Sequence, residues 1–217
     1  MKTKRAFTRI LARAARPAGH LAALTLATAL LSACAPLLLG GAMVGGGMVA
    51  LDRRTSGAQL EDQAIELKSL SRVRDLATLG NVSVTSYNRL LLITGEVPKD
   101  SDRAAVEQAL ARIENVRSVV NELVVAGNSS LSTRSNDAIL SAKVKASFVD
   151  ARDLQANAIK VVAERNIVYL MGRVTDREAN RAAEVARTVP GVQKVVRVFE
   201  LLSEAELADL QPRPAPR

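Results

Sequence analysis

The sequence predicts an α+β fold built from two tandem copies of one small unit, and three observations lead to it. A run of aliphatic residues in each half of the chain ends at an in-strand glycine, Gly95 or Gly172. A short segment that alternates apolar and polar residues precedes each run, as in half-buried strands. A helical segment and a valine-rich segment follow each run, so each copy is expected to fold as helix, strand, strand, helix, strand.

Each copy is expected to form a three-stranded sheet with its two helices on one face. In the first copy, residues 55–126, the expected strands are 82–84, 90–93 and 116–125, and the expected helices are near 62–74 and at 103–113. In the second copy, residues 134–203, the strands are 159–161, 167–171 and 192–201, and the helices are 137–149 and 177–189. A glycine inside a strand predicts a bulge or a close backbone approach. The polar linker Asn128-Ser129-Ser130 suggests that each copy keeps its fold without the other.

The N-terminus has the layout of a bacterial secretory signal peptide, residues 1–33, which is removed and is not part of the fold. Basic residues precede an apolar run at 21–31, and Leu31-Ser32-Ala33-Cys34 resembles a lipobox. Acyl chains such as palmitate on Cys34 would anchor the mature protein. Ala35 stands where an inner-membrane retention signal has Asp, which favours the outer membrane. The alternative is an ordinary signal peptide that ends beside a chance cysteine.

Residues 34–54 are rich in glycine and alanine and too interrupted for a confident membrane span. We expect a flexible apolar tether, and the alternative is a small packed or self-associating segment. The proline-rich tail, residues 204–217, is expected to be disordered.

The composition argues against several classes of function. The chain has a net charge of +8, but residues 1–33 hold six of its 30 basic residues and none of its 22 acidic ones, which leaves +2. A nucleic-acid partner is therefore not expected. The one histidine, His20, lies in the leader, so the mature chain lacks Ser/His and Cys/His catalytic pairs and the preferred zinc ligands. A carboxylate-based enzyme remains formally open, but we expect no enzyme, no cofactor and no metal.

The repeated motifs carry a resemblance to a known domain. Gly95-Glu96-Val97 and Gly172-Arg173-Val174, in this order of elements, are similar to the BON domain (bacterial OsmY and nodulation). Two such copies behind a lipobox, with Asp52-Arg53-Arg54-Thr55 after the tether, resemble the DolP (YraP)-like dual BON outer-membrane lipoprotein family. The resemblance implies a periplasm-facing lipoprotein that binds anionic phospholipid through its second domain, concentrates at division sites and supports envelope integrity.

The charge difference between the copies favours the second one as the lipid-binding domain. Residues 55–126 carry a net charge of −2, whereas residues 134–203 carry +4. Basic residues near an anionic headgroup surface, such as phosphatidylglycerol, contribute favourably to binding.

The helix expected at residues 137–149 has two apolar stripes. Leu140, Val144 and Phe148 form the stripe that we assign to the core. The opposite stripe, with two lysines beside it, is the candidate lipid-binding face and consists of Ile139, Ala142, Lys143, Lys145, Ala146 and Val149. The alternative is that this second stripe packs against the first domain.

A basic pair and a group of acidic residues are weaker candidates for binding sites. Arg53 and Arg54 could contact a phosphate near the membrane, although a basic pair is common in linkers. Glu96, Asp100 and Asp102 could form a cation site, but we expect instead a solvated loop in which they have capping roles. The competing function is a periplasmic adaptor that binds an outer-membrane assembly component or another envelope protein through the open edges of its sheets.

Overall fold

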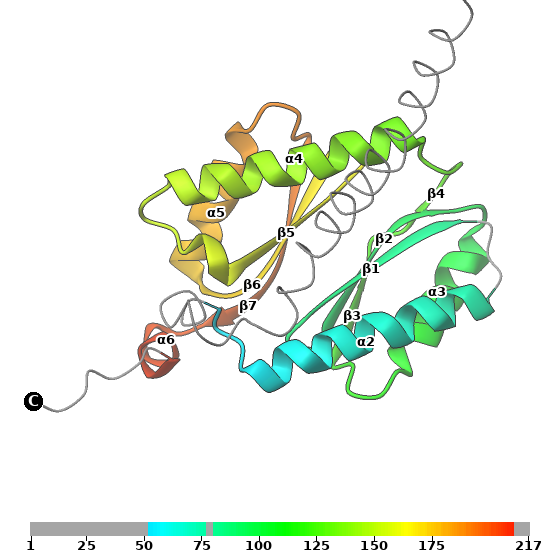
Figure 1. Cartoon of the computed structure of the whole chain (residues 1–217), viewed down its shortest axis with the longest axis horizontal. Helices are drawn as coiled ribbons and strands as arrows, with labels where there is room; N and C mark the ends of the chain where they lie inside the picture. Colours follow the sequence, from blue (N-terminus) through cyan, green and yellow to red (C-terminus); the bar gives the residue numbers. More distant parts are fainter. Residues whose placement is uncertain (1–51, 77–79, 211–217) are drawn as a thin grey trace, which may run out of the picture. The chain divides into compact units, whose positions relative to one another are not determined.

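The computed structural model describes residues 52–76 and 80–210, and it confirms the α+β fold of two repeated domains (Figure 1). The first domain contains α2 Ser56–Asp75, β1 Asn81–Tyr87, β2 Leu90–Val97, α3 Asp100–Ala111, β3 Ser118–Asn121 and β4 Val124–Val125. The second contains α4 Leu131–Asp150, the short 3₁₀ helix η3 Ala156–Ala158, β5 Ile159–Glu164, β6 Ile167–Thr175, α5 Asp176–Thr188 and β7 Lys194–Leu202. Helix α6, Glu204–Leu210, follows.

Both sheets have the same mixed pairing. The first two strands of each domain are antiparallel, and the last strand runs parallel to the middle one. The first sheet differs from the expected continuous third strand, because β3 and β4 pair separately with β2. The Asn121 side chain accepts a hydrogen bond from the Leu123 amide at 3.1 Å, and this local bond replaces strand pairing at the break.

Helix α4 begins six residues earlier than the sequence periodicity predicts. The Ser130 hydroxyl accepts a hydrogen bond from the Thr133 amide at 3.1 Å and caps the helix. The first residue of the linker's serine pair, Ser129, donates its hydroxyl to Glu96 of the first domain. The linker therefore does more than separate the copies, because Ser129 binds the first domain and Ser130 caps α4.

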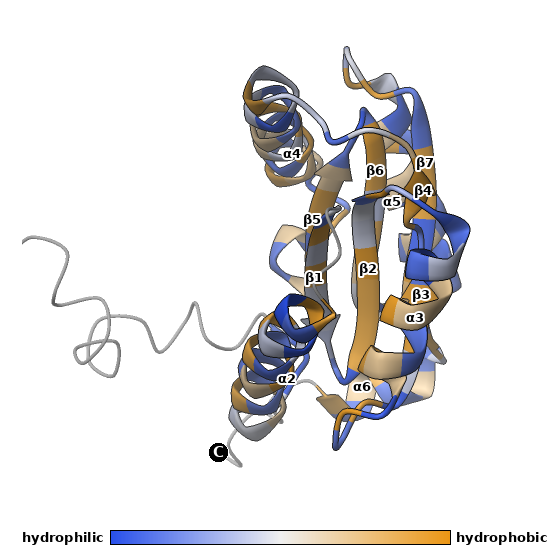
Figure 2. Cartoon of the chain, turned by 90° about the vertical axis from the view of Figure 1, so that its right-hand side faces the viewer, coloured by the Kyte–Doolittle hydropathy of each residue, from blue (hydrophilic) through white to orange (hydrophobic). Residues whose placement is uncertain are grey.

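Apolar residues fill three clusters, and the third joins the two domains. One cluster lies under α4 and α5, and another lies under α2 and α3. The third lies between the two sheets and consists of Tyr87, Leu92, Tyr169, Met171 and Val198. The middle strands β2 and β6 are consequently apolar on both faces, as Figure 2 shows by colour. Both BON-like repeats, within residues 52–76 and 80–210, belong to one compact unit.

The two in-strand glycines are confirmed as sites of close backbone approach. Gly95 has a φ of +113°, and a Cβ there would collide with the Asn81 carbonyl oxygen. A Cβ on Gly172 would lie 2.5 Å from the Ala158 carbonyl oxygen. Any side chain at either position would push the first strand of that domain away.

The tail departs from the expectation of disorder at its start. Residues 204–210 form α6, because Ser203 and Glu206 exchange hydrogen bonds across its first turn and Leu207 is buried. Residues 211–217 lie outside the described residues, as do the signal peptide, Cys34 and the tether up to residue 51.

Candidate functional site

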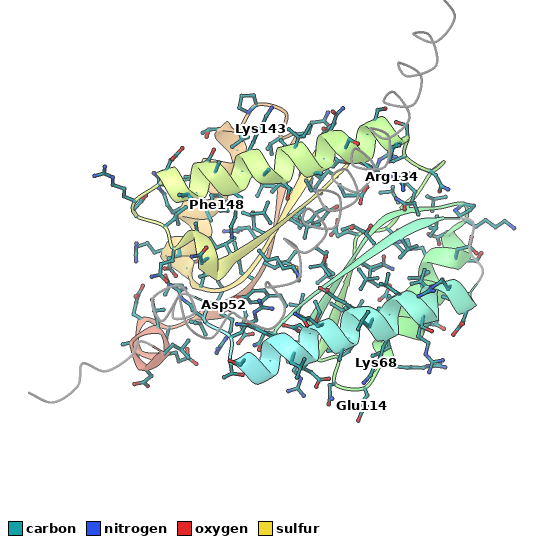
Figure 3. The ribbon with its side chains drawn as sticks, in the orientation of Figure 1. Asp52, Lys68, Glu114, Arg134, Lys143 and Phe148 are labelled. Carbon is teal, nitrogen blue, oxygen red and sulfur yellow. The ribbon has the colours of Figure 1, made fainter. Side chains whose placement is uncertain are left out.

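The core-facing side of α4 agrees with the sequence prediction. Leu140, Val144 and Phe148 are buried in the cluster shared with α5 and the second sheet. Figure 3 shows Phe148 on the sheet side of α4 and Lys143 on its outer side. The opposite face of the helix is therefore left for solvent or a partner.

The outer stripe of α4 is exposed, and the described residues of the first domain do not cover it. Ile139 is 54% exposed and Val149 is 65% exposed, and both Ala142 and Ala146 are also exposed. This exposure contradicts the alternative in which the stripe packs against the first domain. Leu131, which is 73% exposed, extends the stripe by more than a turn toward the N-terminus. Sequence reasoning missed it because Ser130 was not recognised as the helix cap.

The two lysines of the predicted site differ in their surroundings. Lys143 is exposed, and its ammonium has no ion-pair partner among the described residues. Lys145 instead donates hydrogen bonds to the carbonyl oxygens of Ala156 at 2.7 Å and Ile159 at 3.0 Å. Burial lowers the pKa of Lys145. Lys145 therefore ties the end of η3 to α4 and does not present a free charge beside the stripe, which corrects the sequence prediction for this residue.

Arg134 supplies the flanking positive charge that Lys145 does not. It lies eleven residues before Lys145, which is three helical turns and the same side of α4, and it is exposed. Arg134 stands near the start of the helix and Lys143 further along (Figure 3). The outer face of α4 thus combines an apolar stripe with one exposed cation on each side.

Helix α2 also exposes apolar side chains. Leu60 is 68% exposed and Leu67 is 69% exposed, whereas Ile65 faces the core. Figure 1 shows α2 and α4 on opposite sides of the two sheets. Figure 2 shows that both helices nevertheless lie on the same side of the strands, with α3 and α5 on the other side.

Comparison with known proteins identifies the family. A model of the BON domain matches residues 61–127 and 136–202, one match on each repeat. The chain belongs to the BON-domain family. It is 39% identical over 191 residues to "Outer membrane lipoprotein DolP" of Haemophilus influenzae, with 86% of this chain and 97% of that protein covered. Its two BON domains and this similarity make it a DolP-like outer-membrane lipoprotein.

Two further comparisons are more distant. The "21 kDa hemolysin" of Actinobacillus pleuropneumoniae is 29% identical over 152 residues, which cover 69% of this chain and 78% of that protein. A solved structure of CdsD, described as a structural protein of the type III secretion system of Chlamydia trachomatis, covers 68% of this chain and 99% of that one. It has 12% identity and a TM-score of 0.28, which is too low to carry an argument.

The arginine pair before the first BON domain is bound internally. Arg53 forms a bidentate pair with Glu178 of the second BON domain, with both N–O distances at 2.7 Å. Arg54 pairs with Asp62 at 2.8 Å and stacks over the Tyr87 ring at 4.2 Å. Neither guanidinium is therefore available to a phosphate group.

Of the three acidic residues expected in a solvated loop with capping roles, Glu96 is the one that differs from the expectation. Glu96 is completely buried, whereas Asp100 and Asp102 lie in the first turn of α3. Burial opposes the ionisation of Glu96, but hydrogen bonds from Ser129 and Arg165 outweigh it and lower the pKa. Among residues 52–76 and 80–210, no group of His, Cys, Asp and Glu side chains is arranged to hold a metal ion. No helix in the same part of the chain is long and apolar enough to cross a membrane.

Proposed function

We propose that this protein binds anionic phospholipid through the outer face of α4 in its second BON domain, while acyl chains on Cys34 hold it at the outer membrane. The role is one of binding, without catalysis, and it supports the integrity of the envelope, with concentration at division sites. The observation that carries the proposal is the exposed stripe of Leu131, Ile139 and Val149, flanked by Lys143 and Arg134. Such a stripe gains from burial at the headgroup boundary, and the two cations gain from anionic lipid.

The geometry of the tether is compatible with this arrangement. Eighteen residue steps separate Cys34 from Asp52, and a fully extended chain of that length spans at most about 60 Å. A protein anchored at Cys34 can therefore turn α4 toward the same membrane. Local attachment raises the effective concentration of the helix at the surface, so weak contact through α4 suffices.

Vesicle flotation tests the proposal. A fragment that starts at residue 50 spans the compact unit and lacks the lipid anchor. We expect it to float with phosphatidylglycerol vesicles and not with phosphatidylcholine vesicles. Lys143→Glu and Ile139→Asp should each abolish flotation, whereas Lys68→Glu on α2 should leave it unchanged. Flotation of both α4 variants with unchanged affinity would exclude α4 as the lipid site.

Fractionation of cells tests the anchor separately. Cys34→Ser should move the full-length protein out of the outer-membrane fraction after a high-salt wash. A Ser variant that stays fully membrane-bound would show that lipidation is not the anchor.

A second candidate function is that of an adaptor for another envelope protein. The observation that favours it is the exposed pair Leu60 and Leu67 on α2, which the described residues leave uncovered. A photo-crosslinker placed at residue 67 in cells should capture a defined protein, whereas one at the exposed Arg112 of the same domain should not. Identical products at both positions would argue against an adaptor face on α2.

A further inference from the structure

A pocket of about 510 Å³ lies where the two BON domains and their linker meet. Its lining draws on both domains and on the linker and includes Gly95, Glu122, Ser129, Glu164, Arg165 and Tyr169. It does not involve the outer face of α4. Pockets of this size, with apolar walls and a few converging polar groups, are the usual form of a small-molecule site.

Two carboxylate oxygens at this junction are buried without a hydrogen-bond partner. Glu164, at the end of β5, is only 8% exposed, and its Oε1 atom has no partner among the described residues. Glu96 on β2 is fully buried, and its Oε2 atom also lacks one. Buried polar atoms are almost always satisfied, so two unsatisfied oxygens near one pocket point to a missing donor.

The charges around Glu164 are predominantly negative. Burial and the nearby carboxylates of Glu96 and Asp137 together raise the pKa of Glu164 to about 7, against the opposing effect of Arg165 and Arg134. Arg165 is already engaged, because its Nη1 atom lies 3.1 Å from Glu96 Oε1. Glu122 adds a second carboxylate to the pocket lining. The junction therefore holds more negative charge than its own cations neutralise.

We propose that this pocket binds a small organic cation, an ammonium or guanidinium group on a short aliphatic chain, with Glu164 as its main carboxylate partner. Val124 and Ile167 line the pocket and provide apolar walls for the chain. A bare metal ion fits less well, because the described residues offer no set of three or more metal-ligating side chains. The bound cation would take the place of the proton on Glu164 and cross-link the two domains.

Calorimetric titration of the full-length protein with n-butylguanidinium tests this site. We expect binding to be about tenfold weaker at pH 6 than at pH 8, because only about one tenth of a carboxyl group with a pKa near 7 is ionised at pH 6. n-Butylurea, which has the same shape without the charge, should not bind at either pH.

Variants separate the pocket from non-specific attraction. Glu164→Gln keeps the shape of the protonated side chain and should abolish binding, and Glu122→Gln should weaken it. Glu184→Gln on the exposed side of α5 should bind like the parent. Circular dichroism checks that each variant is folded, and the pH dependence of binding by the parent protein provides a readout that needs no variant.

Three outcomes would overturn the proposal. The first is the absence of n-butylguanidinium binding at pH 8, which would mean that water alone satisfies the buried oxygens. The second is equal binding by the parent and by folded Glu164→Gln. The third is stoichiometric displacement of n-butylguanidinium by Mg²⁺ or Ca²⁺ at millimolar concentration, which would assign the pocket to a metal ion.

Discussion

Replacement of Glu164 by glutamine should change how the stability of the protein depends on pH. The pKa of Glu164 is about 7 in the folded protein, mainly because of its burial, against 4.5 for a solvated glutamate. Below pH 4.5 the group is protonated in both the folded and the unfolded states. As the pH rises from 4.5 to 7, the unfolded chain loses this proton while the folded protein keeps it, so the free energy of unfolding falls.

The size of the effect follows from the difference between the two pKa values. Each pKa unit corresponds to about 1.4 kcal/mol, so the loss reaches up to about 3 kcal/mol above pH 7. Glutamine carries no charge at any pH, and Glu164→Gln should therefore be as stable as the parent at pH 4.5 and about 3 kcal/mol more stable at pH 8. In a domain of this size the difference corresponds to about 6–12 °C in Tm.

Urea denaturation at four pH values between 4.5 and 8 measures this difference. Between pH 4.5 and 8, two other groups that could change the free energy of unfolding do not interfere. The chain's one histidine, His20, lies outside the described fold, and the pKa of Glu96 is lowered. Glu184→Gln, an exposed change on α5, serves as the control and should follow the parent. The reasoning is refuted if Glu164→Gln and the parent lose stability in parallel between pH 5 and 8.

Three further predictions concern stability, and urea denaturation measures each of them. Lys145→Met should lower the free energy of unfolding by about 2 kcal/mol, because the η3 carbonyl oxygens lose their charged donor, whereas Lys143→Met should have almost no effect. Equal effects of the two changes would contradict the assigned role of Lys145. Gly95→Ala should cost at least about 2 kcal/mol, since alanine is strained at a φ of +113° and its Cβ meets a backbone oxygen, and a cost near zero would exclude that strain. Arg53→Met should cost about 3 kcal/mol by leaving the Glu178 carboxylate buried and unpaired, and adding Glu178→Gln should recover part of the loss; no recovery would show that the cost lies elsewhere.

Local patterns in the sequence were enough to predict much of the fold. The spacing of Leu140, Val144 and Phe148 is a property of one helix, and it identified the buried side of α4 correctly. The two in-strand glycines likewise gave the register of the repeat, because each is required by the strand directly beside it. Caps were harder to recognise, since Ser130 is one of several polar residues in a row, and α4 was therefore predicted too short.

The remaining features depend on contacts between distant parts of the chain. The buried carboxylate of Glu96 accepts a hydrogen bond from Arg165, 69 residues away. The guanidinium of Arg53 is bound by Glu178, 125 residues away. The aliphatic runs of β2 and β6 predicted strands but could not show that their second faces meet each other. Lys145 looked like an ordinary surface lysine because its carbonyl partners lie beyond the end of its own helix.

The apolar layer between the two sheets has a mechanical consequence. Since the two sheets share one apolar core, the orientation of one BON domain relative to the other is fixed by packing rather than set by a hinge. With α4 lying on a bilayer, the second domain would therefore hold the first in one constant orientation, and the exposed Leu60 and Leu67 would keep a constant position relative to the membrane.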